Sequence, residues 1–569
     1  MFGFSIIISK NKELPFSEFK WKKPFDFQPE FIKRKFLSNG ILFEQFTLKN
    51  LANEKLWVDT SEFFIVTEGV ITNLKALTEE FKAKDYTTLL LHLIKEKTFF
   101  NKFKGHFSGF IYYKKTGNCF AFNNHTGSKK LFYFSNSDYL LFGSDLYTLH
   151  EALKSLKIKT TPDIEAAYLL LSSGFMMSDF TLIKEIKQIC AGQYAKLIDN
   201  NITIDSYFHL SEISENSLNK KDIIEKIDYL FQKAIQYEYS IDENYKLNSI
   251  STLSGGLDSR MTTLIAHKLG FNQTCLNFSE MGYADQIIAN EISDKYKLKL
   301  HFVPLKADSL INIDKVILVN DGLTIYTGAS HVFEALKNLN IQNTGLIHTG
   351  ILGDAIFGSY LRKKEIEAPD INNGSYSMLM SIKTASLKRK IAADYTSDEV
   401  FKFYTRGFHG INNGFLYFDL LGETTSAFLE PEFLKFVLSI PREFRIKECI
   451  YIDWIHNLQP TCGDFIWENQ GGKPTNNEIL RSFYRYKRAI IKRLPFKSMW
   501  KNNMNPEQLW YDKNPNVKQY LDTYYQNHLY LADFNKELLT DLTKMYNTGT
   551  ITEKTQVLTL LAAYKLHFT

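Results

Sequence analysis

The sequence predicts an α/β protein in two parts, a β-rich sandwich followed by a domain with a parallel sheet. Three observations support this. Over roughly residues 1–210, short aromatic and β-branched runs are broken by Asn, Gly and Ser, as in antiparallel strands. From about residue 220, helical patterns alternate with short apolar strands. After about residue 380 the pattern is mostly helical, and 569 residues are too many for one core.

In the first part, the opening run MFGFSIIISK is expected to form a strand. No basic residue precedes its apolar stretch, so it does not resemble a signal peptide. Further strands are predicted within 63–71, 107–115, 119–124, 130–144 and 193–199. The segments NLKALTEEFKAK and YTTLLLHLIKEK between them have helical spacing. Two packed antiparallel layers with flanking helices would satisfy this order.

In the second part, strands and helices alternate. The expected strands are KLNSISTL, QTCLNF, KLHFVPL and TGLIHTG, and the helices between them are RMTTLIAHKLG and ADQIIANEISDKYK. This alternation favours a parallel sheet. The helical region that follows is interrupted by a polar, Gly-rich loop, ENQGGKPTNNE, at 468–478.

Composition argues against several classes of protein. Apolar residues make up 44%, aromatic residues 15% and charged residues 23%, which is typical of a packed globular protein. A net charge of +5 is small for this length and argues against nucleic acid as a partner. No apolar run approaches the roughly 18 residues of a membrane span. The five cysteines are far apart without metal-site spacing, which predicts buried reduced thiols in a cytoplasmic protein.

The stretch STLSGGLDSR, residues 251–260, carries the clearest chemical signal. Glycines between a strand end and a helix start let backbone N–H groups converge on an anion, and the helix N-terminus adds positive potential. The hydroxyls of Ser254 and Ser259 can donate to further phosphate oxygens. Asp258 would repel a phosphate, so a divalent cation is expected between them. No Lys follows the glycines, so this is not a Walker loop.

A second Gly-rich turn, HTGILGDAIFGSY at 348–360, follows another predicted strand. In an open parallel sheet, ligands bind at the carboxyl ends of the strands. Asp354 is therefore expected to meet Asp258 across one site and to share a magnesium ion with it. Either turn alone could be merely structural, but the two together predict a phosphate site.

These motifs resemble those of the asparagine synthetase family. The first turn matches the SGGxDS loop of ATP pyrophosphatases, and the second stands where the family has SGEGxDExFGGY. The segment at 278–305 resembles the family's adenine-side strand and helix, with Asp285 at its aspartate, and 430–445 resembles a later helix. In the first part, similarity to a class II glutaminase domain rests on EGVITNLKAL, FKGHFSGF, NNHTGSKKLFYF, FGSDLYTL and ICAGQYAKL.

The resemblance implies an N-terminal Ntn-type αββα sandwich over 1–210 and a PP-loop adenine-nucleotide α-hydrolase domain over 220–569. It also implies ATP and Mg²⁺ as cofactors, with Asp258 and Asp354 as the metal ligands. The residues implied to bind ATP and pyrophosphate are Leu253, Ser254, Gly255, Gly256, Asp258, Ser259, Phe278, Thr349 and Gly350.

Two residues are candidates for catalysis. Lys473, in GGKPTNN, is matched to the family's lysine that contacts the α-phosphate, and an exposed loop lysine is the alternative interpretation. Glu423, in LLGETTSAF, is a candidate general base, and a satisfied surface carboxylate is the alternative there.

Two departures from the family pattern bear on function. A class II glutaminase uses a cysteine at its mature N-terminus as the nucleophile. This chain begins Met1-Phe2-Gly3 and its first cysteine is Cys119, so we expect no release of ammonia from glutamine. Ile351 stands where the family has a glutamate and β-lactam-forming relatives have a tyrosine. Isoleucine can only pack.

The sequence therefore predicts an ATP-dependent, AMP-forming carbon–nitrogen ligase. It would adenylate a small-molecule or peptide carboxylate and join it to an amine, as β-lactam synthetases and lasso-peptide cyclases do, or to ammonia. A partner protein that supplies ammonia, and a homodimer, are left open. The competing hypothesis is a catalytically silent scaffold, which the two departures favour and the retained aspartates disfavour. An ATP pyrophosphatase that modifies nucleic acid is disfavoured by the weak charge.

Overall fold

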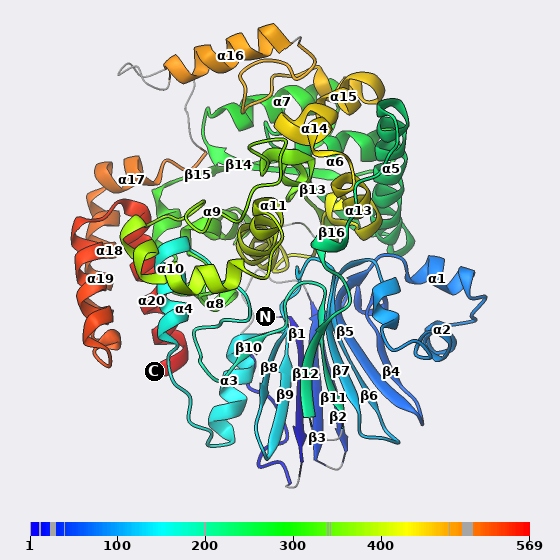
Figure 1. Ribbon diagram of the computed structural model, residues 1–569, viewed down its shortest axis with the longest axis vertical. Coiled ribbons are helices and arrows are strands. Elements are labelled where there is room, and N and C mark those ends of the chain that lie inside the picture. Colours follow the sequence, from blue (N-terminus) through cyan, green and yellow to red (C-terminus); the bar gives the residue numbers. More distant parts are fainter. Residues whose placement is uncertain are drawn as a thin grey trace.

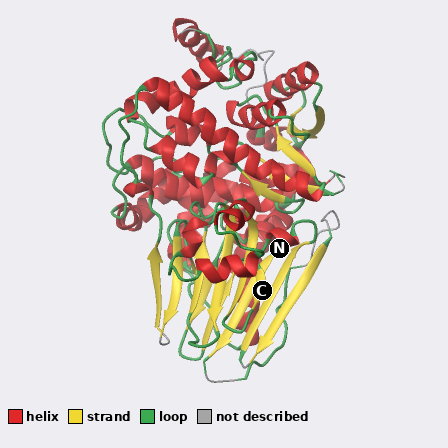
Figure 2. Cartoon of the chain, turned by 90° about the vertical axis from the view of Figure 1, so that its right-hand side faces the viewer, coloured by secondary structure: helices red, strands yellow, loops and turns green. Residues whose placement is uncertain are grey.

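The computed structural model describes residues 2–569 except 11–12, 23–29, 39, 199–200, 338, 340, 342, 477 and 492–503. A β-sandwich forms one end of the molecule, and a helix-rich part that contains a parallel sheet forms the other (Figure 1). Figure 2 shows the same division from the side, with long strands at one end and helices at the other. The predicted α/β class, with antiparallel strands first and a parallel sheet later, is confirmed.

Two six-stranded antiparallel sheets form the sandwich. The first has the order β10-β8-β9-β1-β3-β2 and consists of β1 (Gly3–Ser9), β2 (Phe31–Ser38), β3 (Ile41–Leu48), β8 (Phe132–Ser135), β9 (Tyr139–Gly143) and β10 (Lys187–Gln188). The second has the order β12-β11-β7-β6-β5-β4 and consists of β4 (Trp57–Asp59), β5 (Phe63–Ile71), β6 (Gly105–Tyr113), β7 (Cys119–Asn123), β11 (Gln193–Ile198) and β12 (Asn201–Ser206).

Apolar side chains fill the sandwich in layers. Phe4 and Ile6 of β1 pack between the sheets against Phe110 and Ala121 of the second sheet. Helices α1 (Leu74–Glu80) and α2 (Tyr86–Leu93) cover the outer face of the second sheet. Helices α3 (Leu146–Ser155) and α4 (Ile164–Ser173) cover the first. Because neighbouring side chains on a strand point to opposite faces, central strands such as β5 are buried on both. The αββα sandwich is confirmed.

The parallel sheet has five strands in the order β15-β14-β13-β16-β17. They are β13 (Asn248–Thr252), β14 (Thr274–Glu280), β15 (Lys299–Leu305), β16 (Thr344–His348) and β17 (Glu423–Thr425). Helices α5 (Lys220–Tyr245), α6 (Leu257–Lys268) and α7 (Ala284–Tyr296) pack on one face, and α8 (Ile313–Asn320) and α9 (Thr327–Lys337) on the other. Since β13 and β16 are neighbours, the turns that follow them lie at one edge of the sheet.

The rest of the chain is mostly helical, as predicted. Its helices are α10 (Met378–Ala392), α11 (Asp398–Lys402), α12 (Phe415–Phe418), α13 (Pro431–Leu438), α14 (Arg442–Arg445), α15 (Cys449–Leu458), α16 (Glu478–Ile491), α17 (Glu507–Lys513), α18 (Pro515–His528), α19 (Lys536–Thr548) and α20 (Ile551–Phe568). Helix α20 returns to the N-terminal part, where Gln556 Nε2 donates to the Leu170 carbonyl of α4 at 3.1 Å.

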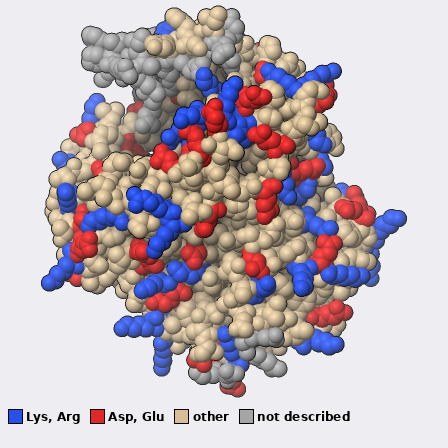
Figure 3. Space-filling model, viewed as in Figure 1, with Lys and Arg blue, Asp and Glu red and all other residues tan. Residues whose placement is uncertain are grey.

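The surface charges are mixed in sign, and the cysteines differ in their burial. On the face in Figure 3, positive and negative side chains are interspersed, with no field of a single sign. Four cysteines are buried, but Cys449, at the start of α15, is exposed, so the prediction of buried thiols was wrong there. No described helix is both long enough and apolar enough to cross a membrane.

Candidate active site

The predicted phosphate loop connects β13 to α6 and is closed by its own serines. Ser254 Oγ lies 2.9 Å from Ser259 Oγ, which also accepts from the Ser254 N–H at 3.0 Å. The Gly256 N–H donates to Ser254 Oγ at 3.2 Å. Each serine hydroxyl carries one hydrogen, and only one of the two is used in the bond between them. The other hydrogen can be donated to a ligand. No side chain caps the N-terminus of α6, so its first-turn N–H groups also suit an anion.

Gly255 is the most confined residue of this loop. Its N–H donates to Asp285 Oδ1 at 2.8 Å, and its carbonyl accepts from the Glu468 N–H and from Arg260 Nη2, each at 3.0 Å. A methyl group here would lie 2.7 Å from Glu468 Cβ and 2.8 Å from Asp285 Oδ1, which only glycine avoids. Asp285, which the sequence analysis matched to the family's aspartate, therefore fixes the main chain of the phosphate loop at Gly255.

The second turn brings Asp354 to Asp258. The Asp354 N–H donates to Asp258 Oδ2 at 2.9 Å, and the Tyr451 hydroxyl donates to Oδ1 at 2.9 Å. Burial, reinforced by the charge of Asp354, raises the pKa of Asp258 well above its ordinary value. Gly353 permits this approach, since a Cβ there would lie 2.5 Å from the Asp258 carboxyl carbon. The predicted meeting of the two turns is thus present.

This pair of carboxyl groups fits a magnesium ion that takes its other ligands from phosphate and water. Among the described residues, no group of three or more His, Cys, Asp or Glu side chains could hold a metal. Asp258 and Asp354 by themselves therefore offer part of a coordination shell, which suits a cation that arrives with a nucleotide.

A cavity of about 400 Å³ opens beside the two turns. Gly255, although part of the loop, does not line it. The other residues predicted to bind nucleotide all do: Leu253, Ser254, Gly256, Asp258, Ser259, Phe278, Thr349 and Gly350. The Thr349 hydroxyl donates to the Thr425 carbonyl at 3.0 Å, so it fixes the wall of the cavity.

Several residues of this site were missed from the sequence. His331 of α9, Phe418 of α12 and Met504 line the cavity. The ring of Phe278 lies 5.7 Å from that of His331 and 6.4 Å from that of Phe418. Burial, opposed by the Thr327 carbonyl, lowers the pKa of His331 to about 4. No motif marks these residues, because their position follows from packing across the sheet.

Ile351 and Lys473 differ in their relation to the cavity. Ile351 lines it, and its carbonyl accepts from Ser426 Oγ at 3.1 Å. Lys473 is exposed and does not line it. Its loop is nevertheless joined to the phosphate loop, through the bond from Glu468 to Gly255 at 3.0 Å. The role assigned to Lys473 stays a prediction.

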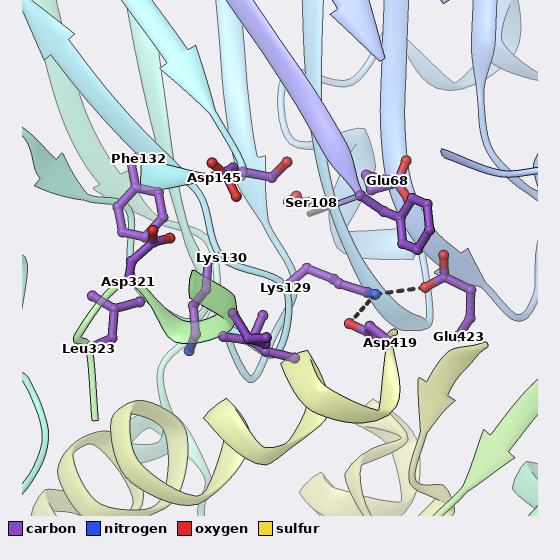
Figure 4. A pocket seen from close by; sticks show the side chains of 14 residues that line it. Glu68, Ser108, Lys129, Lys130, Phe132, Asp145, Asp321, Leu323, Asp419 and Glu423 are labelled. Carbon is purple, nitrogen blue, oxygen red and sulfur yellow. Dashed lines mark hydrogen bonds and ion pairs between the residues drawn. The ribbon is translucent and has the colours of Figure 1, made fainter. Parts of the chain in front are cut away.

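Glu423 lies elsewhere, at the junction of the two parts of the molecule. It is on β17, and its side chain is 1% exposed and paired with Lys55 and Lys129 of the sandwich, the latter at 2.6 Å. Figure 4 shows Lys129 reaching both Glu423 and Asp419. Burial would raise the pKa of Glu423, but the two lysines outweigh it and lower the pKa to about 2. The structure does not bring this candidate base to the cavity beside the two turns.

Two family models match the chain, one for a glutamine amidotransferase domain over residues 47–208 and one for asparagine synthase over residues 247–406. Asparagine synthetase (glutamine-hydrolysing) 1 of Bacillus subtilis is 24% identical over 271 residues, which are 44% of this chain and 41% of that protein. Putative asparagine synthetase (glutamine-hydrolysing) 2 of Methanocaldococcus jannaschii is 25% identical over 318 residues, 53% and 60% of the two chains. The chain thus spans less than two thirds of either relative's length.

Among solved structures, a glutamine phosphoribosylpyrophosphate amidotransferase of B. subtilis, complexed with ADP and GMP, matches 72% of this chain and 88% of its own. Its identity of 9% and TM-score of 0.23 are too low to add to the argument. The two matched segments follow one another in the chain, the amidotransferase domain first and the asparagine synthase domain second. The chain belongs to the asparagine synthetase family.

Proposed function

We propose that this protein is an ATP-dependent, AMP-forming ligase that adenylates a carboxylate and joins it to an amine or ammonia. The observation that carries the proposal is the bond from the Asp354 N–H to Asp258 Oδ2 at 2.9 Å, which unites two Gly-rich turns beside a large cavity. A magnesium ion held there by both aspartates would shield the charge of a leaving pyrophosphate.

Different residues of the cavity bind different parts of ATP. The hydroxyls of Ser254 and Ser259 and the first turn of α6 bind the β- and γ-phosphates, and Phe278 packs against the base. The substrate carboxylate attacks the α-phosphorus, so that pyrophosphate leaves and an acyl-adenylate forms. A neutral amine then attacks the acyl carbon and releases AMP. Lys473, on the joined loop, would approach the α-phosphate.

Incubation of the protein with ATP, magnesium and a panel of carboxylates, starting with L-aspartate, tests this function. The expected products are AMP and pyrophosphate, which ³¹P NMR detects. Labelled pyrophosphate is also expected to exchange into ATP. Formation of ADP and phosphate would contradict the proposal. A protein that binds no ATP at all would instead favour the silent scaffold.

We further propose that the sandwich does not hydrolyse glutamine. Support comes from the residue at the head of β1, which is Phe2 and stacks on Phe46 at 5.6 Å. Phe2 lines a cavity with Glu68, Ser108 and Lys129, and no cysteine is among the residues around it. Cys119 is fully buried, which raises the pKa of its thiol. Among the described residues that line that cavity, none can therefore supply a thiolate nucleophile.

Glutamine alone, or with ATP and magnesium, is expected to yield no glutamate above the rate without protein. A glutamate dehydrogenase assay measures this, with a glutamine-hydrolysing asparagine synthetase as the positive control. Glutamate release by the purified chain would overturn the argument from Phe2.

The acceptor nitrogen is proposed to come from a bulkier amine-bearing substrate or from ammonia outside the chain. Ile351 lines the nucleotide cavity with Phe418 and Val332, which makes this wall apolar. An ionisable group near the reacting amine would hold or remove its proton, and isoleucine does neither. Efficient synthesis of asparagine from aspartate would contradict this view.

Gly353→Ala is expected to weaken the binding of ATP with magnesium about tenfold or more, because the new methyl group would displace the Asp258 carboxylate. Titration calorimetry measures the affinity. Gly407→Ala is the control, since a Cβ there meets nothing closer than 3.6 Å. Equal affinities in the two variants would show that the approach of the turns does not matter for binding.

A further inference from the structure

Arg260 is a buried cation whose charge no described carboxylate neutralises by an ion pair. Arg260 is 0% exposed to solvent. Nη1 donates to the carbonyls of Cys462 at 3.1 Å and Phe465 at 3.3 Å, and Nη2 to those of Gly255 at 3.0 Å and Ile466 at 2.8 Å. Nε has no partner. Burying a guanidinium is costly unless its charge is compensated, so this arrangement needs an explanation.

The four carbonyls belong to two separate segments of the site. Gly255 is in the phosphate loop, whereas residues 462–466 lead into the loop 467–476 that carries Lys473. The second loop is tied to itself by the bridge between Trp467 and Gly472. One guanidinium therefore joins the phosphate loop to the base of the lysine loop, and the Glu468 N–H adds a bond at 3.0 Å to the same Gly255 carbonyl.

The charge of Arg260 also lies where an anion is expected. It is in the first turn of α6, directly after Ser259, and its guanidinium bonds the main chain of Gly255. Asp285 accepts the Gly255 N–H at 2.8 Å, on the other side of the same peptide segment. In a buried setting the field of a fixed charge is poorly screened and needs no reorganisation when a ligand arrives.

We infer that Arg260 is a positioning residue of the nucleotide site, which locks the Lys473 loop to the phosphate loop and places a buried positive charge behind the bound pyrophosphate group. The electrostatic half of this inference, the positive charge behind the pyrophosphate, rests on the proposed function. The locking half, the link between the two loops, depends on the hydrogen bonds alone. Each half can therefore fail without the other.

The test compares Arg260→Met and Arg260→Lys with wild type and with Lys268→Met. Lys268 is the matched control, because it is on the same helix and also reaches across to the neighbouring segment, at Gln459 Oε1 3.1 Å away. Calorimetry measures the affinity for pyrophosphate with magnesium, for ATP with magnesium, and for adenosine. Limited proteolysis without ligand measures cleavage within 467–476.

Arg260→Met is expected to lose about tenfold or more in affinity for pyrophosphate and ATP, and less than about twofold for adenosine. Arg260→Lys should recover part of the pyrophosphate affinity, because it keeps the charge but not the fork of donors. Both variants should be cleaved faster in 467–476 at temperatures well below unfolding. A merely structural role would lower all three affinities together.

Unchanged pyrophosphate affinity in Arg260→Met would overturn the electrostatic half, and unchanged cleavage would overturn the locking half. If wild type binds neither ATP nor pyrophosphate, the proposed function and the electrostatic half both fall, and the cleavage pattern still decides the locking. If Arg260→Met does not fold, Arg260→Lys carries the same comparisons.

Discussion

Asp258→Asn and Asp354→Asn should each lower ATP–pyrophosphate exchange about a hundredfold or more, because a neutral amide is a much poorer magnesium ligand than a carboxylate. Asparagine keeps the shape of the side chain, so the bond from the Asp354 N–H to residue 258 can persist. The loss should therefore fall on charge compensation rather than on folding. Exchange is measured with the carboxylate that supports the highest rate in wild type.

Asp512→Asn is the matched control, since Asp512 is exposed on α17 and bonds Gln508 at 3.0 Å. It should exchange as wild type does. Adenosine affinity should also be unchanged in both site variants, because adenosine brings no phosphate charge. Full exchange in Asp258→Asn and Asp354→Asn would refute the two-aspartate site.

Patterns local in sequence predicted much of this site. The strand that ends before Ser254 and the strand that ends before Thr349 were both recognised from their apolar runs. Parallel topology then required their turns to share an edge, and the bond between Asp354 and Asp258 realises this.

Contacts between distant segments were beyond such reasoning. Tyr451 donates to Asp258, and residues 462–466 accept from Arg260, although about 200 residues separate the partners. Strand β2 was missed because three consecutive cations interrupt its apolar residues. Its residues alternate between half-buried and exposed rather than between apolar and polar. Strand β17 has three residues, too few for any period. Nothing in the sequence around Glu423 indicated that lysines of the sandwich would form ion pairs with it.

Glu423→Gln is expected to lower the free energy of unfolding by about 3 kcal/mol, because it removes the carboxylate that two buried lysines share. Lys55 is 0% exposed and Lys129 is 10% exposed at the side chain, so water cannot replace the lost charge. Glu68 and Asp419 still pair with these lysines, which keeps the variant foldable. Urea denaturation at pH 7, followed by tryptophan fluorescence, measures the change.

Glu432→Gln is the control, because Glu432 also pairs with two lysines, Lys104 at 2.8 Å and Lys233 at 3.0 Å, but its side chain is 41% exposed. Solvent screening should keep its cost below about 1 kcal/mol. The lysines hold the pKa of Glu423 at about 2, below the ordinary 4.5, so its stabilisation is complete above about pH 4.5 and is lost as pH falls toward 2. The difference in stability between wild type and Glu423→Gln should therefore shrink over that range. Equal costs for the two variants at pH 7, or a difference independent of pH, would mean that the buried cluster does not hold the sandwich to the parallel sheet.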